Sequence, residues 1–218
     1  AEYKVMGLAA YGDPKPFSAH FSKLITQFKD GSYQLNMEYF DFDWSDKRMF
    51  SKKLVALFGH PPRTPEGKVF QYHKDIAAAL QKTLEKVVFQ LLNTVYKKYN
   101  TPNLCFSGGV ALNSVLNGKI LSQTPFQKLY IPPDPSDAGG AMGAALHIAA
   151  HSSKKPMKAN AFTPFLGPQY SWYAIQKILD KHQIAYSFYP DKKKLLGVVA
   201  ASLTKQKVIG WFQGRMEW

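Results

Sequence analysis

The sequence predicts an α/β protein, on two observations. Within residues 103–150 the same series occurs twice: a short apolar strand, a glycine-containing loop and a helix. A long amphipathic helix precedes these residues. Strands that alternate with helices in this way form a parallel sheet whose faces the helices cover. The strands are predicted at 103–106 and 128–131, and the helices at 75–99, 111–122 and 141–150. With 218 residues and 45% hydrophobic content, the chain has enough apolar surface for one substantial core.

The first third of the chain is predicted to be mostly irregular. Residues 4–12 hold two glycines and small side chains, and Asp13 with the proline after it imposes a turn, because proline fixes φ. A loop is therefore expected there. Apolar and polar residues alternate over 32–42, which predicts a half-buried strand, and residues 29–31 before it are typical of a hairpin turn. Three prolines make 58–67 irregular.

Residues 75–99 are predicted to form one helix, because apolar residues recur every three or four positions. Asp75 is its expected N-cap, since aspartate oxygens accept the free amide hydrogens of a first helical turn. The predicted apolar face consists of Ile76, Leu80, Leu84, Val87, Val88, Leu91 and Val95.

The chain is predicted to have two domains, residues 1–160 and 161–218. Residues 151–163 are polar and rich in lysine and have no periodicity, as is typical of a linker. Beyond them, helices are expected at 171–182 and 192–204 and a strand at 208–212. This order indicates the beginning of a second α/β domain.

Composition narrows the class of protein. The formal charge of +13 suggests an anionic partner, but the lysines are scattered, which favours a solvated basic surface over a nucleic-acid footprint. No apolar stretch reaches the roughly 20 residues of a membrane span. The single cysteine, Cys105, cannot form an internal disulfide and is expected to pack as a small hydrophobe. A cytoplasmic protein without a membrane partner is expected.

The first candidate site is the turn that follows the strand at 103–106. A strand that ends in Gly108 and Gly109 and leads into a helix brings bare backbone N–H groups and a helix N-terminus to one point, where negative charge is stabilised. Asn113, about one turn into the helix, is placed to reach a ribose or a phosphate. A tight turn with a solvated asparagine is the alternative. Neither a P-loop nor a dinucleotide fingerprint is present.

The second candidate site lies one strand later, at residues 132–143. Gly139 and the glycines after it let the backbone approach a ligand, and Asp137 precedes the predicted helix. Asp137 has two interpretations, an N-cap or a hard oxygen ligand for a divalent metal beside phosphates. By itself its position favours the cap. Glycine loops at neighbouring strand ends form a crevice of the kind that binds ligands in α/β proteins.

Four separated motifs along the chain carry a resemblance to a known family. They are KVMGLAAYG at 4–12, FSGGVALNSVLN at 106–117, PSDAGGAMGAAL at 135–146 and GWFQGRMEW at 210–218, with FGHPPR at 58–63 and DIAAALQ at 75–81 between the first two. In sequence and order they closely resemble the O-carbamoyltransferase family, which includes nodulation and antibiotic-tailoring carbamoyltransferases. The resemblance covers nearly the whole chain.

The resemblance implies a fold and a reaction. The fold is that of the sugar kinase, actin and heat-shock ATPase superfamily, closest to the ATPase of tRNA threonylcarbamoyladenosine synthesis; residues 1–160 would be the second half of such a domain. The reaction carries the carbamoyl group of carbamoyl phosphate to ATP, giving carbamoyl adenylate, and then to a hydroxyl of a sugar or another small-molecule acceptor. The implied cofactors are ATP and a divalent metal, Fe, Mg or Mn.

The resemblance also assigns roles to individual residues. The family turn that holds the nucleotide matches Gly108, Gly109 and Asn113, and Gly139 lies in the loop beside it. Asp137 matches a metal ligand, which reverses the preference for a simple cap. Lys4 and Gly7 match an opening motif near the nucleotide. Arg215 matches the first arginine of the motif GRxExGPRALG and is the predicted catalytic residue, suited to bidentate phosphate recognition.

The chain departs from the family pattern at two places. It has no HxxxH motif in the family's position for two metal-binding histidines, and it stops before GPRALG. His147 and His151 have the spacing of a metal-binding pair, but they lie on a different element, and a helix end favours a histidine without any metal. We therefore expect this chain alone to be inactive. A tRNA-modifying relative and a basic nucleic-acid-binding module are the alternative functions.

Overall fold

The computed structural model describes residues 2–152, 165 and 167–216. Its contacts divide the chain into two compact units, residues 1–152 and 153–218, each of which is described by itself. The chain is mixed α/β, with a majority of helices and, in its described part, two small two-stranded sheets. Among the described helices, none combines the length and the apolar character needed to cross a membrane.

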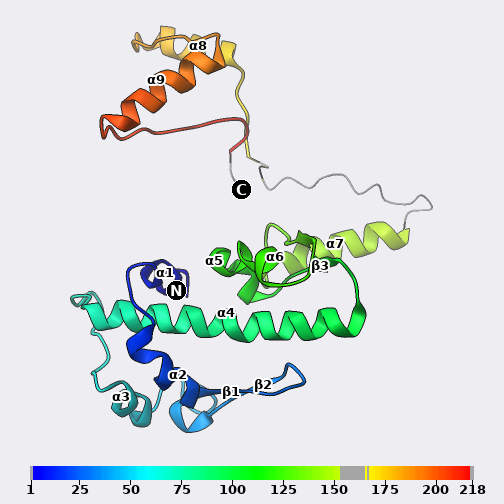
Figure 1. Ribbon diagram of the computed structural model, residues 1–218. Helices are drawn as coiled ribbons and strands as arrows, with labels where there is room; N and C mark the ends of the chain where they lie inside the picture. Colours follow the sequence, from blue (N-terminus) through cyan, green and yellow to red (C-terminus); the bar gives the residue numbers. More distant parts are fainter. Residues whose placement is uncertain (1, 153–164, 166, 217–218) are drawn as a thin grey trace. The chain divides into compact units, whose positions relative to one another are not determined.

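Helix α4 (Gln71–Tyr99) is the central element of the first unit (Figure 1). It begins four residues before the predicted start, so the prediction of Asp75 as N-cap is wrong. The backbone N–H of Phe70 donates to Nδ1 of His73 at 2.9 Å, and the N–H of His73 donates back to the Phe70 carbonyl. A histidine thus takes the place that glutamate or glutamine has in a capping box. Asp75 instead accepts the backbone N–H of Asp13 at 2.8 Å.

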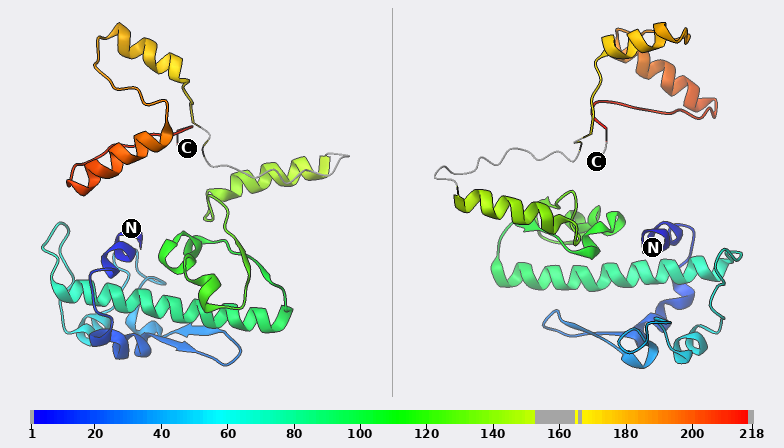
Figure 2. Two further views of the ribbon diagram at one scale, coloured as in Figure 1. Left: turned by 45° about the horizontal axis from the view of Figure 1, so that its top comes forward. Right: turned by 180° about the vertical axis from the view of Figure 1, so that it is seen from behind.

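Chain segments pack against two opposite sides of α4, as the views in Figure 2 show. Because both sides are covered, burial does not follow one apolar stripe, and the predicted face is only partly right. Val87 and Val88 are buried, whereas Leu80 and Leu91 are 44% and 39% exposed. The buried residues of α4 are Ala77, Ala78, Ala79, Gln81, Val87, Val88 and Leu92.

One side of α4 carries the segment that follows α1 (Glu2–Ala9). Its elements are η1 (Lys15–Phe17), α2 (Ser18–Leu24), the antiparallel strands β1 (Ile25–Gln27) and β2 (Tyr33–Leu35), η2 (Met37–Tyr39) and α3 (Lys52–Phe58). Phe17, Phe21 and Leu24 form its core with Ala79 of α4.

Two predictions for residues 4–42 need correction. The predicted loop at 4–12 is a helix as far as Ala9, since its small residues suit close packing of α1 against α4. The predicted strand at 32–42 forms only at 33–35, because Asn36 then accepts the N–H of Glu38 and starts η2. The hairpin turn at 29–31 is confirmed: Gly31 has φ 87°, and Phe28 bonds Ser32 across it.

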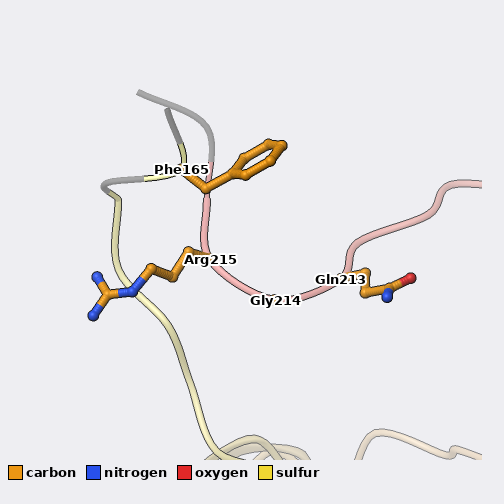
Figure 3. A pocket seen from close by; sticks show the side chains of 4 residues that line it. All are labelled: Phe165, Gln213, Gly214 and Arg215. Carbon is orange, nitrogen blue, oxygen red and sulfur yellow. The ribbon is translucent and has the colours of Figure 1, made fainter. Parts of the chain in front are cut away.

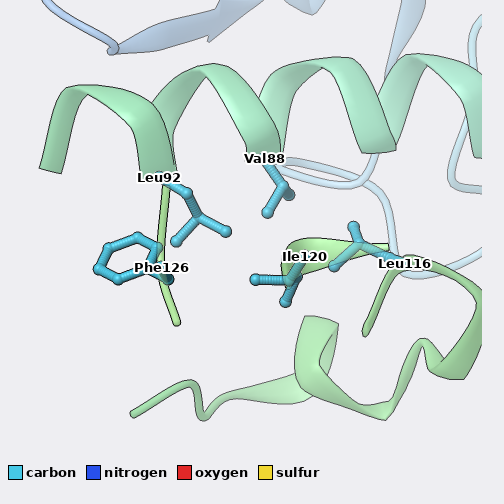
Figure 4. Packing of buried hydrophobic residues seen from close by; sticks show 5 residues of the cluster. All are labelled: Val88, Leu92, Leu116, Ile120 and Phe126. Carbon is cyan, nitrogen blue, oxygen red and sulfur yellow. The ribbon is translucent and has the colours of Figure 1, made fainter. Parts of the chain in front are cut away.

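The other side of α4 carries the predicted strand, loop and helix repeats. Strands β3 (Asn103–Cys105) and β4 (Lys128–Tyr130) are paired in parallel, as predicted, and α7 (Gly139–Ser152) follows the second loop. Figure 4 shows the core on this side, where residues between β3 and β4, among them Phe126, pack on α4. The buried cluster consists of Val88, Leu92, Leu116, Ile120 and Phe126. Cys105, expected to be packed, is exposed.

The single helix predicted at 111–122 is wrong. The segment consists of three short elements, η3 (Gly109–Leu112), α5 (Ser114–Asn117) and α6 (Ile120–Gln123). Asn113 has the extended angles φ −78° and ψ 90°, and its side chain caps α5, so the helix cannot continue through it.

In the second unit, helices α8 (Trp172–Lys181) and α9 (Lys192–Thr204) lie where they were predicted. The strand predicted at 208–212 is wrong: the described residues after Thr204 form neither helix nor strand, and Val208 is 98% exposed. A strand needs a neighbour that takes its backbone hydrogen bonds, and the described part of this unit contains none. Most of the predicted linker at 151–163 lies outside the described residues.

Candidate functional site

The two glycine turns lie side by side at the carboxyl ends of β3 and β4. The carbonyl of Pro135, in the second turn, accepts both the N–H of Gly108 at 2.7 Å and the hydroxyl of Ser107 at 2.9 Å, in the first turn. The N–H of Phe106 bonds the Tyr130 carbonyl at 2.9 Å just before the turns begin. The two predicted loops are therefore joined at one edge of the sheet.

The first turn requires a glycine and leaves its backbone open. Gly108 has φ 101°, a conformation that residues with a Cβ rarely adopt. A Cβ atom built at Gly108 or at Gly109 would meet no atom within 4 Å, so open space lies above both residues. The backbone of both residues is therefore not covered by side chains.

Asn113 has its side chain engaged within the protein. Its Oδ1 accepts the N–H of Leu116 at 2.9 Å, which caps α5. Its amide also forms two bonds with Gln81 of α4: Nδ2 donates to Oε1 of Gln81 at 2.8 Å, and Nε2 of Gln81 donates to Oδ1 at 3.1 Å. Asn113, which was predicted to contact the nucleotide, thus has a structural role: it joins the turn to α4.

The beginning of the chain lies beside the first turn. Helix α1 packs against α4, and Ser114 contacts the sulfur of Met6 at 3.8 Å. A cavity of about 350 Å³ separates α1 from the turn, and this volume is within the usual range for small-molecule sites. It is lined by Glu2, Tyr3, Met6, Leu84, Gly109, Val110, Leu112 and Asn113. Lys4 and Gly7 are exposed on the same helix but do not line this cavity.

A second cavity of about 360 Å³ lies next to the first and shares Met6 with it. Its walls include the charged pair of Glu85 on α4 and Lys119, whose Nζ lies 2.6 Å from Oε1 of Glu85. Gln81 also lines this cavity and donates to the same carboxylate oxygen at 2.9 Å. The side chains of Gln81 and Asn113 thus connect the two cavities.

Asp137 and Gly139 lie in the second turn and have different surroundings. Asp137 is exposed, and no hydrogen bond or ion pair of its carboxylate is found among the described residues, so it is available to a ligand. A Cβ at Gly139 would overlap the carbonyl of Asp134, so the turn itself requires this glycine. Asp134 stabilises the turn, because its Oδ1 accepts both the N–H and the hydroxyl of Ser136.

The described residues contain no group of three or more histidine, cysteine, aspartate or glutamate side chains that could hold a metal. His147 and His151 lie with ring centroids 4.1 Å apart on α7, and Nδ1 of His151 bonds the His147 carbonyl at 2.8 Å. The described residues around Asp137 therefore do not form a metal site of three such side chains.

Arg215 lies in the second unit, beside a cavity of about 440 Å³ lined by Phe165, Gln213, Gly214 and Arg215 (Figure 3). Its Nη1 donates to the carbonyl of Gly167 at 3.0 Å, and two backbone bonds join Met216 to Gly167 and Pro168. The guanidinium is thus anchored at one nitrogen, while its other N–H groups are available to an anion.

Sequence reasoning missed several residues that build the site. A signal for Gln81 and Glu85 was present: they are polar residues one turn apart on the helix that supplies the core. No signal in the sequence pointed to the carbonyl of Pro135. The motif that starts at Lys4 already placed the beginning of the chain near the turn, although it did not include Tyr3.

Comparison with known proteins identifies the family. Residues 1–146 match the family described as carbamoyltransferase N-terminus. The chain is 43% identical to an uncharacterized protein of Synechocystis sp., 30% identical to nodulation protein NolO of Bradyrhizobium diazoefficiens and 31% identical to nodulation protein NolNO of Sinorhizobium fredii, in each case over 99% of this chain. It spans about a third of the length of these relatives, with 36%, 37% and 30% covered. The chain therefore belongs to the carbamoyltransferase family.

Proposed function

We propose that the protein is an O-carbamoyltransferase that moves the carbamoyl group of carbamoyl phosphate, by way of ATP and a carbamoyl adenylate, to a hydroxyl of a sugar or another small molecule. Membership of the carbamoyltransferase family supports the transfer itself. The observation that supports a nucleotide route is the joined pair of glycine turns, with open backbone at Gly108 and Gly109 beside a cavity of about 350 Å³. A fold of the sugar kinase, actin and heat-shock ATPase superfamily belongs to the same proposal.

The residues have separate roles in this proposal. The open backbone at Gly108 and Gly109 binds the nucleotide, with the N–H of Gly109 as donor because that of Gly108 is donated to Pro135. Asn113 also donates to the nucleotide. Lys4 and Gly7 of α1 lie near the nucleotide, and Gly139 shapes the second turn. Backbone N–H groups fixed before the substrate arrives stabilise charge that develops on phosphoryl and carbamoyl oxygens without reorganisation.

Two further residues bind charged groups. Asp137 contributes one carboxylate ligand to a divalent metal, Fe, Mg or Mn, which when bound offsets negative charge on phosphate oxygens. Arg215 binds a phosphate group of carbamoyl phosphate through the N–H groups that Gly167 does not use. Its planar guanidinium matches two phosphate oxygens at once.

The test is release of pyrophosphate from ATP by the full-length protein, with and without carbamoyl phosphate. Carbamoyl phosphate loses its phosphate to water and gives carbamate, whose oxygen attacks the α-phosphate of ATP and displaces pyrophosphate. Wild type is expected to show release that depends on carbamoyl phosphate. Asp137→Ala should lower the rate at least about tenfold, whereas Asp43→Ala, which removes another exposed aspartate, should not. Absence of release in the wild type would overturn the nucleotide route, and an unaffected Asp137→Ala variant would overturn the metal assignment.

A further inference from the structure

Gln81 is a polar side chain in the core of the first unit. It is 9% exposed and lies on α4 next to the buried residues 77–79. Its amide forms three hydrogen bonds: Nε2 donates to Asn113 and to Glu85, and Oε1 accepts from Asn113. Buried polar groups are usually bonded in this way. The partner with which Gln81 forms two bonds is Asn113, which lines the cavity beside the glycine turn.

The orientation of both amides is fixed from two ends. At one end the backbone N–H of Leu116 can only donate, so it must meet the oxygen of Asn113 and not its nitrogen. At the other end the Glu85 carboxylate, paired with Lys119, can only accept, so it must meet the nitrogen of Gln81. A single arrangement of the two amides satisfies both ends. The donor and the acceptor of every hydrogen bond in the series from Lys119 through Glu85, Gln81 and Asn113 to Leu116 are therefore determined.

This arrangement leaves Asn113 one unused donor. Its Oδ1 accepts from Gln81 and from Leu116, which uses both lone pairs. Its Nδ2 carries two hydrogens, of which one is donated to Oε1 of Gln81. Asn113 can therefore give a ligand in the cavity one N–H and no acceptor.

We propose that Gln81, oriented by Glu85, is a positioning residue for Asn113. Because of Gln81, Asn113 offers the nucleotide only an N–H, so the nucleotide atom bound there must be an oxygen that accepts a hydrogen bond. The inference rests on the proposed nucleotide function of Asn113. Gln81 does not touch the nucleotide itself. It acts by holding the Asn113 amide with its nitrogen toward the ligand, which avoids the cost of ordering that side chain when the nucleotide binds.

The test measures the Kd of the full-length protein for ATP by calorimetric titration, together with the midpoint of thermal unfolding. Gln81→Met keeps the approximate volume and removes all three hydrogen bonds, and it should raise the Kd about tenfold. The matched control is Gln90→Met on the same helix, where the amide donates to the Phe28 carbonyl at 2.7 Å, away from both cavities. It should lower the unfolding midpoint and leave the Kd unchanged.

A double-mutant cycle separates positioning from general stability. If Gln81 acts through Asn113, Gln81→Met should have no further effect on the Kd in an Asn113→Ala background, whereas independent effects would multiply. Should Gln81→Met not fold, Glu85→Gln replaces it: the two amides are then oriented from the Leu116 end alone, and this weaker hold on Gln81 should also raise the Kd.

The outcomes distinguish this inference from the proposed function. Failure of the wild type to bind ATP would overturn the proposed function and this inference with it. ATP binding by the wild type with an unchanged Kd in Gln81→Met, or in Glu85→Gln where the former does not fold, would overturn the inference alone. Independent effects in the cycle would do the same.

Discussion

Gly12 lies so close to α4 that no side chain fits. A Cβ atom there would overlap the Lys74 carbonyl, and the next residue, Asp13, is bonded to Asp75. Gly12→Ala should therefore destabilise the protein by about 1–3 kcal/mol, the usual cost of overpacking. The measurement is the free energy of unfolding in denaturant.

Gly7 provides the control for this substitution. It lies in helix α1, and a Cβ there would meet nothing within 4 Å. Gly7→Ala should be neutral or should stabilise the protein by up to about 1 kcal/mol, since alanine favours helix. Equal destabilisation by the two changes would contradict the packing argument.

We predict that His73 makes the stability of the protein depend on pH. Burial, followed by the nearby charges of Arg63 and His60, lowers the pKa of His73. The hydrogen bond from the Phe70 N–H to Nδ1 also needs an unprotonated nitrogen. Because the unfolded chain binds this proton more readily, stability is lost as the pH falls through the ordinary histidine pKa of about 6.5. The unfolding midpoint should therefore be lower at pH 5.5 than at pH 7.5.

His73→Gln tests the source of this dependence. A glutamine at this position can accept the same backbone N–H, as in an ordinary capping box, but does not titrate. The variant should keep most of the stability at pH 7.5 and lose less of it at pH 5.5. An identical pH dependence in both proteins would exclude His73 as the cause.

Some features of the site could be predicted from single residues and others could not. Gly108 could be assigned to an open turn because glycine has a distinct backbone preference, and the structure places it there with φ 101°. The engagement of Asn113 could not be foreseen, because its partner Gln81 lies 32 residues away. Contacts across such a separation depend on how the elements pack, and local patterns do not contain that information.

At the scale of elements, Asp75 joins two segments that are distant in sequence. Its Oδ1 accepts the Asp13 N–H at 2.8 Å and the Gln71 amide at 2.9 Å, and thereby fixes the start of α4 to the turn after α1. Asp75→Ala should destabilise the protein by about 1 kcal/mol, measured by denaturant unfolding. Asp75→Asn keeps an oxygen acceptor and should cost less. An equal loss in the two variants would show that the charge of Asp75, and not its acceptor oxygen, provides the stability.

Elements were predictable where local patterns determine them. Strands β3 and β4 and helices α8 and α9 lie as predicted, since short apolar runs and clear caps such as Ser171 and Asp191 mark them. The break between η3 and α5 was missed because Asn113 was interpreted as a residue of a continuous helix. Helix propensity alone does not show that its side chain caps the next turn.

At the scale of the whole molecule, the two units differ in how much core they contain. The first has two buried clusters, on opposite sides of α4. The described residues of the second include none that is buried, and the ring of Trp172 there stacks on that of Phe188, with centroids 4.5 Å apart. The sequence did not predict this contrast, because both units contain apolar residues.

The difference predicts different unfolding behaviour. A fragment of residues 1–152 should unfold in one cooperative transition in a calorimeter, whereas a fragment of residues 153–218 should show none, because a cooperative transition needs buried apolar surface. A sharp heat-absorption peak from the shorter fragment would contradict this expectation.

Because the Pro135 carbonyl accepts from both Ser107 and Gly108, we expect the two turns to become ordered together. A ligand that orders the first turn would then also order the second, so occupancy of one would change the affinity of the other. Such linkage is reciprocal: a metal at Asp137 would increase nucleotide affinity by the same factor by which the nucleotide increases metal affinity. Ser107→Ala would weaken this cooperativity, because the hydroxyl is one of the two groups that transmit it.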